Sequence, residues 1–256
     1  MIMAERPQEI TRTYFLSAGE TDAEGCMPMA RIFERVIEVA TDHANILNIG
    51  YAKLIESGIG WVLTRMSVEM LRYPRINETY SLTTWIEGFN RLYSDRCFVL
   101  CDADGNEIGH IRTMWMAIDI KKRTAADLTQ YEDDLPIGTR KCPVEMQRKL
   151  PPLTEISKEN TYTFRFSDLD FNRHVNTVQY VRLLLNQWPL EFFDANEISR
   201  FDIAFHQECH FGETVEIRLE GYDPCGCVPH DDTKCEIVRE GKRAVAAVLS
   251  FRHRSE

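Results

Sequence analysis

Just past its middle, the sequence reads Ser167-Asp168-Leu169-Asp170-Phe171-Asn172-Arg173-His174-Val175-Asn176. If this stretch is extended, alternate side chains share a face. One face then carries four polar side chains: Asp170, Asn172, His174 and Asn176. The other face carries apolar side chains that can pack: Leu169, Phe171 and Val175. A carboxylate, an imidazole and two amides along one edge are suited to proton transfer and hydrogen bonding.

A helix is expected directly after this stretch, over Thr177–Asn186, with Asn176 as its N-cap. The free N–H groups of a helix N-terminus stabilise a developing oxyanion, so the polar face has the features of a reactive site. The alternative is an Asx-rich turn that only caps the helix, because Asp and Asn are common in such turns. An internal repeat and a second candidate glutamate favour the reactive site.

The composition indicates a globular protein whose expected compartment is the cytoplasm. The chain has 256 residues, of which 44% are hydrophobic, and a net charge of −10 that argues against nucleic acid as the main partner. No stretch reaches the ~18 apolar residues that a membrane span needs, and residues 1–6 do not begin a signal peptide. The eight cysteines are therefore expected to be reduced thiols: Cys26, Cys97, Cys101, Cys142, Cys209, Cys225, Cys227 and Cys235.

The secondary-structure patterns occur twice in the same order. The first half predicts a strand at Ile10–Leu16, a polar loop at Ala18–Met27, an amphipathic helix from Pro28 to near Gly50, and strands at Trp61–Leu71, Glu78–Gly88, Arg91–Asp102 and Glu107–Ile120. The second half predicts a strand at Thr161–Phe166, a helix from Thr177, and strands near Phe201–His210, Thr214–Gly221, Thr233–Glu240 and Arg243–His253. The proline-rich segment Thr129–Asn160 is expected to cross the surface, with a short helical piece near Pro143–Lys149.

The repeat is also visible in the residue spacing. Asp22 precedes Asp170 by 148 residues, and the glycine turns at Gly105 and Gly241 are 136 residues apart. A helix cradled by an antiparallel sheet, twice over, is a tandem double hot-dog fold of the α+β class. We expect domains at residues 8–130 and 158–256, joined by a linker at 131–157.

Several motifs resemble the acyl-acyl-carrier-protein thioesterases of the FatA/FatB type, in a bacterial form. The stretch Asp168–Tyr180 is similar to the signature of that family. Further similar motifs follow the family order: Trp61-Val62-Leu63-Thr64-Arg65-Met66, Arg72-Tyr73-Pro74 and Gln207-Glu208-Cys209. The resemblance covers nearly the whole chain, from about Tyr14 to Phe251, and the family's two tandem hot-dog domains agree with the repeat.

The resemblance implies hydrolysis of the thioester between a fatty acyl chain and the phosphopantetheine arm of acyl carrier protein. We expect neither a cofactor nor a metal. The resemblance assigns the family's catalytic residues to Asp170, Asn172, His174 and Glu208 in the second half. The first half has Glu24 and Cys26 at the positions that match Asn172 and His174. We therefore expect the first half to supply core and acyl-binding surface without chemistry.

A thioester needs an activated attacker and a polarised carbonyl, because its thiolate leaves readily. Asp170 or Glu208 can attack or activate water, His174 can orient the carboxylate or return a proton, and Asn172 can hydrogen-bond the carbonyl oxygen. The sequence does not decide which carboxylate attacks.

Cys209 is the alternative nucleophile, which would give a Cys-His-Asn set. In an unbroken strand it shares the apolar side with Phe201, Ile203, Phe205 and Phe211, whereas Glu208 lies on the other side with Ala204, His206 and His210. This alternation favours Glu208, unless a bulge intervenes.

Two further clusters suggest binding. A zinc site is the first possibility, but the spacing of its four candidate ligands is typical of a reduced surface loop: Cys225, Cys227, His230 and Cys235.

An acidic carrier protein would need a basic patch on this acidic chain, and the candidates are Lys121, Lys122, Arg123, Arg140 and Lys141. A homodimer is a possible assembly.

Two other functions remain open at this point. A hot-dog acyl-CoA thioesterase could use the same catalytic residues, and a non-catalytic acyl-binding module could share the fold. Retention of the complete polar set in one half argues against the binding module, and neither acyl chain length nor saturation preference follows from the sequence.

Overall fold

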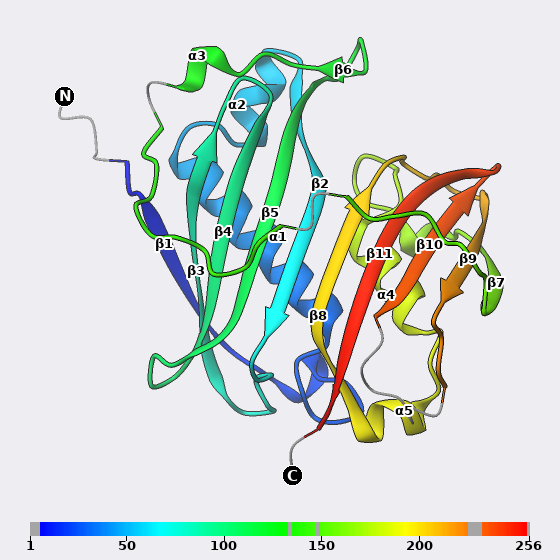
Figure 1. The fold of residues 1–256 in the computed structure, drawn as a ribbon. Coiled ribbons are helices and arrows are strands. Elements are labelled where there is room, and N and C mark those ends of the chain that lie inside the picture. Colours follow the sequence, from blue (N-terminus) through cyan, green and yellow to red (C-terminus); the bar gives the residue numbers. More distant parts are fainter. Residues whose placement is uncertain (1–5, 133–134, 147–148, 225–231, 255–256) are drawn as a thin grey trace.

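The computed structural model describes residues 6–132, 135–146, 149–224 and 232–254. Each half has one long strand at the middle of the molecule and further strands that continue outward (Figure 1). The first half contains β1 (Glu9–Phe15), β2 (Ile59–Met70), β3 (Thr79–Phe89), β4 (Tyr93–Asp102), β5 (Glu107–Asp119) and β6 (Thr124–Ala125). The second half contains β7 (Lys158–Thr163), β8 (Asn196–Phe205), β9 (Thr214–Glu220), β10 (Thr233–Arg239) and β11 (Lys242–His253).

All of these strands belong to one antiparallel sheet in the described part of the chain. Its order is β1-β3-β4-β5-β2-β8-β11-β10-β9-β7, with β6 attached to β5. The halves join where Arg65–Glu69 of β2 pairs antiparallel with Arg200–Ala204 of β8. Edge-to-edge joining protects one edge of each half from other chains.

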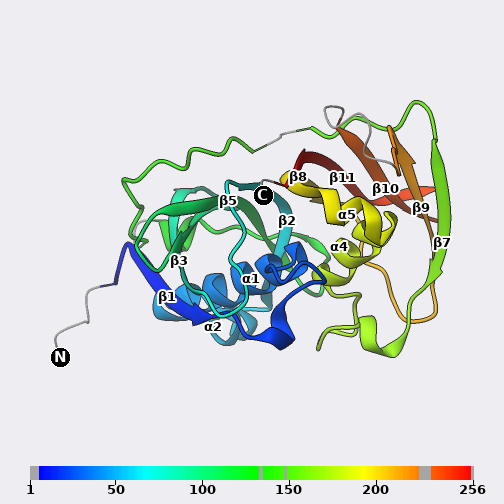
Figure 2. The ribbon, with the colours of Figure 1, turned by 90° about the horizontal axis from the view of Figure 1, so that it is seen from below.

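One long helix lies along each half of the sheet. The first half has α1 (Met29–Ile46), α2 (Tyr51–Glu56) and α3 (Thr129–Glu132), and the second half has α4 (Thr177–Leu185) and α5 (Leu190–Ala195). Two single turns of 3-10 helix, η1 (Ala18–Glu20) and η2 (Phe166–Asp168), precede the loops that enter α1 and α4. Helices α1 and α4 contact each other beneath the sheet (Figures 1 and 2), which gives the predicted tandem double hot-dog fold.

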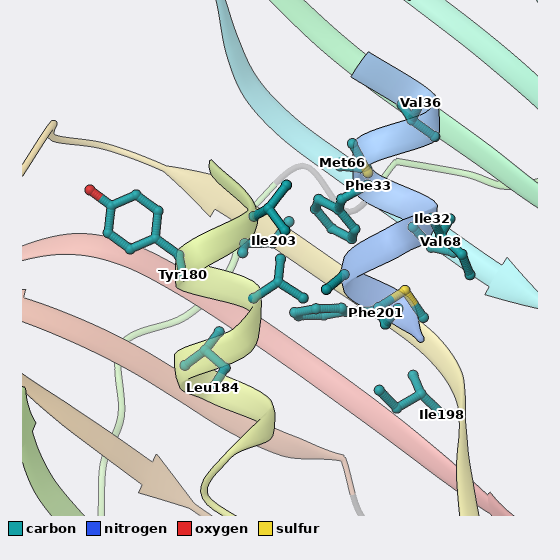
Figure 3. Close-up of a cluster of buried hydrophobic side chains, with 14 of the residues drawn as sticks. Ile32, Phe33, Val36, Met66, Val68, Tyr180, Leu184, Ile198, Phe201 and Ile203 are labelled. Carbon is teal, nitrogen blue, oxygen red and sulfur yellow. The ribbon is translucent and has the colours of Figure 1, made fainter. Parts of the chain in front are cut away.

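The core continues without a break from one half into the other (Figure 3). Phe33 of α1 and Phe201 of β8 are fully buried, and their ring centroids lie 5.7 Å apart. Further apolar residues of α1 and β2 are also buried: Met29, Val36, Met66, Val68 and Met70. Because α1 presents apolar residues every three or four positions, one of its faces is fully packed.

The segment between the halves crosses the face of the sheet opposite the helices (Figure 1). Leu150 packs with Ala204, Ala246 and Val248 of the second half. In the first half, the Nε1–H of Trp85 donates to the carbonyl oxygen of Arg140 at 2.9 Å. The surface course that the sequence predicts is thus confirmed.

Several predicted boundaries are wrong. Among the described residues near the predicted Pro143–Lys149 piece, none is helical, while residues 147–148 lie outside the described structure. The region instead begins with α3, and the short helices α2 and α5 were not predicted. The expected strand Phe201–His210 begins earlier and ends at Phe205, and the expected Thr161–Phe166 is β7, which ends at Thr163. The division at 8–130, 131–157 and 158–256 stays a prediction.

Candidate active site

The loop that precedes α4 is a tight turn, so the prediction of an extended stretch is wrong. The Asp170 N–H donates to the His174 carbonyl oxygen at 2.8 Å, and the Arg173 N–H donates to the Asp170 carbonyl oxygen at 3.0 Å. Arg173 has a φ of +65°, which no extended residue has. Leu169 and Val175 close the turn as a β-bridge.

The Asp170 side chain stabilises this turn. Its Oδ1 accepts the N–H of Asn172 at 2.8 Å and the N–H of His174 at 3.2 Å. This is the Asx turn that was the alternative interpretation of the sequence. Asn176 caps α4 as predicted, because its side chain accepts the N–H of Val178 at 2.9 Å.

The same turn brings His174 to Glu208. His174 forms a β-bridge with His210, which places it beside the segment that follows β8. Nδ1 of His174 lies 3.5 Å from Oε1 of Glu208, and the two side chains are 27% and 28% exposed. Both groups are thus paired and also open to a reactant. A carboxylate at Nδ1 orients the imidazole and leaves Nε2 for proton transfer.

Arg123 of the first half holds the other oxygen of Glu208. Its guanidinium forms an ion pair with Oε2 of Glu208. Arg123 lies in the turn between β5 and β6 with a φ of +57°, and its N–H donates to the Asp119 carbonyl oxygen at 2.8 Å. The Asp119 carboxylate accepts two further N–H groups of this turn, from Lys121 and Lys122. A fixed turn therefore presents Arg123 to the second half.

A second contact joins the two halves at this place. Phe171, at the tip of the loop, is 76% exposed, although the alternation pattern predicted that it would be packed. Its ring meets the ring of Tyr51 in α2 edge to face, with centroids 5.4 Å apart. The polar cluster is therefore bounded by α2 and the β5–β6 turn of the first half.

Cys209 is buried in the core, as the alternation predicted. The Tyr180 hydroxyl accepts its backbone N–H at 3.1 Å, and burial raises the pKa of the Cys209 thiol. The strand is irregular here, because the N–H groups of His206 and Gln207 both donate to the Ala244 carbonyl oxygen. A buried thiol with a raised pKa has little thiolate, so Cys209 is unsuited to be a nucleophile. Phe211, predicted on the same apolar side, is 65% exposed.

Models of one protein family match almost the entire chain. The N-terminal domain of acyl-ACP thioesterases matches residues 7–133, and the C-terminal domain matches residues 153–253. The chain belongs to the acyl-ACP thioesterase family. The loop with Asp170 and His174, together with Glu208, therefore lies in the C-terminal domain of that family.

Individual members of the thioesterase family are distant in sequence. An acyl-[acyl-carrier-protein] hydrolase of Cuphea viscosissima is 29% identical over 67% of this chain and 44% of its own length. An oleoyl-acyl carrier protein thioesterase of Arabidopsis thaliana is 25% identical over 70% of this chain and 54% of its own. The chain thus spans about half the length of the curated relatives it matches.

Solved structures of thioesterases superimpose on nearly the whole chain. An acyl-ACP thioesterase of Bacteroides thetaiotaomicron is 27% identical with a TM-score of 0.87, covering 98% of this chain and 100% of its own. A 12:0-ACP thioesterase of Umbellularia californica is 18% identical with a TM-score of 0.84, covering 98% of this chain and 96% of its own, and shares the fold.

Of the residues that the sequence singled out, His174 and Glu208 meet side chain to side chain. The Asp170 side chain stabilises their turn by accepting backbone N–H groups, and Asn172 is exposed at the turn. The sequence indicates Arg123 only as part of a basic run, and its pairing with Glu208 was not predicted. The basic triplet itself was the available signal, but its partner lies 85 residues away.

The metal interpretation rests mostly on undescribed residues. Cys225, Cys227 and His230 lie outside the described structure, while Cys235 is buried in β10. Within the described ranges, no group of three or more His, Cys, Asp or Glu side chains is arranged to hold a metal ion. The described helices include none long and apolar enough to cross a membrane.

Proposed function

We propose that the protein hydrolyses the thioester of fatty acyl-acyl carrier protein and releases a free fatty acid and holo acyl carrier protein. The observation that carries this proposal is the Arg123–Glu208–His174 arrangement beside the N-terminus of α4. It supplies an oriented imidazole, partly exposed, in a chain of the acyl-ACP thioesterase family.

His174 is the general base in this proposal. The Glu208 carboxylate, 3.5 Å from Nδ1, orients the imidazole, and Nε2 takes a proton from water as the water oxygen attacks the thioester carbon. The carbon–sulfur bond then breaks, and His174 returns the proton to the departing thiolate. Asn172 hydrogen-bonds the carbonyl oxygen or aligns its neighbours.

Neither the Glu208 carboxylate nor the Asp170 carboxylate is the preferred nucleophile. Both oxygens of Glu208 face positively charged or donating groups, Arg123 and His174. One oxygen of Asp170 accepts two backbone N–H groups. Hydrogen bonding and ion pairing of this kind stabilise a carboxylate and reduce its tendency to attack. Activated water is therefore the proposed attacker.

The carrier protein is proposed to dock on the turn that carries Arg123. Lys121 and Lys122 share this turn, and Lys122 is 77% exposed, with its ammonium 3.5 Å from Asp119. In the other predicted basic cluster, Arg140 pairs with Glu107 and lies over the Trp85 ring at 5.0 Å, whereas Lys141, 3.6 Å from Glu87, is as exposed as Lys122. An acidic partner at the first cluster would lie beside His174 and Glu208.

We propose the cytoplasm as the compartment, although the plant relatives are named as chloroplastic. The described cysteines are free thiols, which agrees with a reducing compartment.

Release of free thiol from acyl-acyl carrier protein and from acyl-CoA, followed with a thiol-reactive dye, tests the activity. We expect faster release from acyl-acyl carrier protein. A preference for acyl-CoA would favour the acyl-CoA thioesterase alternative. No release from either substrate would contradict both thioesterase functions and leave an acyl-binding module.

A further inference from the structure

The first half contains a second copy of the reactive loop's backbone. The Asp22 N–H donates to the Cys26 carbonyl oxygen at 2.8 Å, as Asp170 does to His174 at 2.8 Å. Oδ1 of Asp22 accepts the N–H groups of Glu24 and Cys26, both at 3.0 Å. The sequence offset of 148 residues therefore corresponds to the same turn, stabilised by the same aspartate.

The side chains that would perform chemistry are replaced in this copy. Cys26 occupies the place of His174. The Met27 N–H donates to the Pro74 carbonyl oxygen, just as the Val175 N–H donates to that of Cys209. The residue before Pro74 is Tyr73, which therefore occupies the place of Glu208.

Both replacements are buried and inert. Cys26 is 5% exposed and Tyr73 is 7% exposed. Burial raises the pKa of the Cys26 thiol and of the Tyr73 phenol, and the Tyr73 hydroxyl donates to the Ile198 carbonyl oxygen at 2.8 Å. In this copy, neither the place of His174 nor the place of Glu208 holds a base or a carboxylate.

A cavity of about 300 Å³ lies at the second copy. It is bounded by the first-half loop on one side and by α5 and the start of β8 on the other, which lie together in Figure 1. Its apolar lining includes Met29, Leu185, Trp188, Leu190, Phe193 and Ile198. A mostly apolar cavity of this size is at the lower end of the range for small-molecule sites, about 300–1,000 Å³.

The charges around the cavity disfavour an anion. Glu197 lies 2.6 Å from Arg252 and 3.5 Å from Arg254, and of these two guanidinium groups only that of Arg254 lines the cavity. Three carboxylates, those of Asp22, Glu24 and Glu197, line the cavity with one guanidinium, that of Arg254, so the lining has a net negative charge. A carboxylate or phosphate entering there would be repelled.

We propose that this cavity is a non-hydrolytic binding site for a single aliphatic chain with an uncharged head group. The apolar walls contact the chain, and the net negative charge of the lining discriminates against ionised fatty acids. The site is separate from the proposed catalytic cluster, and its occupancy does not depend on hydrolysis.

Calorimetric titration of the full chain with 1-decanol and with decanoate at neutral pH tests the proposal. We expect decanol to bind about tenfold or more tightly than decanoate, because only the carboxylate is repelled. Glu24→Gln removes one negative charge and should narrow this difference by strengthening decanoate binding. Equal binding of both ligands to the unmodified chain would overturn the proposal.

A matched pair of variants tests whether decanol binds in this cavity. Leu190 lines the cavity and is 58% exposed, so Leu190→Trp can fill the cavity with little risk to folding. Leu71 is 57% exposed and lies outside the lining, so Leu71→Trp is the control. We expect Leu190→Trp to weaken decanol binding at least tenfold and Leu71→Trp to leave it unchanged. Decanol binding that survives Leu190→Trp, or that is absent from the unmodified chain, contradicts the assignment.

Discussion

Glu208 lies between a guanidinium from one half of the molecule and an imidazole from the other. Arg123 contacts Oε2, and Nδ1 of His174 lies 3.5 Å from Oε1. A carboxylate bound on both sides has a defined orientation, which it passes to the imidazole. In the proposed reaction, Glu208 therefore orients the base.

His174→Ala and Glu208→Gln are expected to lower turnover by ~10²–10⁴, because they remove the base or its orientation. Cys209→Ala should retain turnover and cost about 1 kcal/mol of stability, typical of a point mutant. Hydrolysis of one acyl-acyl carrier protein substrate, with folding checked by circular dichroism, makes the comparison. A folded but inactive Cys209→Ala beside an active Glu208→Gln would reverse the assignment.

Arg123→Gln should lower kcat by up to about 10²-fold, since a displaced catalytic group can cost that much, while KM changes little. Arg123→Lys should recover part of the loss by restoring a cation at Glu208. Lys122→Gln removes the neighbouring charge on the same turn and serves as the control for an effect on carrier docking alone. If Arg123→Gln raises KM and leaves kcat unchanged, the guanidinium serves docking and does not position Glu208.

The sequence indicated which residues form the candidate site more successfully than it indicated how their side chains are arranged. His174 and Glu208 could be selected from spacing and family resemblance. Side chains do not alternate around Asp170, because its own carboxylate accepts two backbone N–H groups and the chain turns there. The Arg123 contact could not be predicted, because no local pattern joins residues on different halves.

Helix α1 carries a buried histidine that links it to the sheet. His43 is fully buried, with its Nδ1 accepting from Nη1 of Arg96 at 2.8 Å and its Nε2–H donating to the Pro7 carbonyl oxygen at 3.1 Å. Burial, together with the nearby Arg96 charge, lowers the pKa of His43 to about 4. The imidazole is therefore neutral in the folded protein at neutral pH.

Acid should destabilise the protein through His43. Between its ordinary pKa of 6.5 and its folded pKa of about 4, the unfolded chain binds a proton that the folded chain does not. Stability from this group is complete above pH 6.5 and declines as pH falls, by about 3 kcal/mol near pH 4. Urea unfolding from pH 7 to pH 4.5 should show a shallower decline for His43→Gln. The exposed His253→Gln is the control, and an unchanged slope for His43→Gln would contradict this account.

The long elements were predictable from the sequence and the short ones were not. Helix α1 has a sustained apolar period over 18 residues. In contrast, α2 and α5 have six residues each, and each buries a single side chain, Leu54 or Phe192. Six residues contain too few turns for a period to stand out, and such helices depend on tertiary contacts.

The two halves of the molecule are joined at the seam between β2 and β8. Oγ of Ser67 in β2 donates to Oδ1 of Asp202 in β8 at 2.5 Å. Asp202 also accepts from Arg200 at 2.6 Å, and Arg200 forms an ion pair with Glu69 across the seam. Polar side chains thus reinforce the backbone pairing that makes one sheet of two halves.

Asp202→Ala should lower the unfolding free energy by about 2 kcal/mol, less than the ~3–5 kcal/mol for a fully buried pair because Arg200 is partly exposed. Thermal unfolding should remain a single transition, because the halves share a sheet and a core. Glu159→Ala, which removes an exposed pair with Arg218 at the outer edge, should change stability little. Two separate transitions in the unmodified protein would show that the halves unfold independently.

The turn at Asp22 and the turn at Asp170 lie on one chain, so they can differ in sequence, whereas the two copies of a site in a symmetric dimer cannot. In a homodimer of identical subunits, every substitution appears in both copies. Here the copies lie on one chain, so Cys26 and Tyr73 could replace reactive groups on one side while His174 and Glu208 stayed on the other. In the proposed reaction each chain then has one turnover centre, and initial rates of the monomeric protein should follow a simple hyperbola with substrate concentration, without the cooperativity that paired identical centres permit.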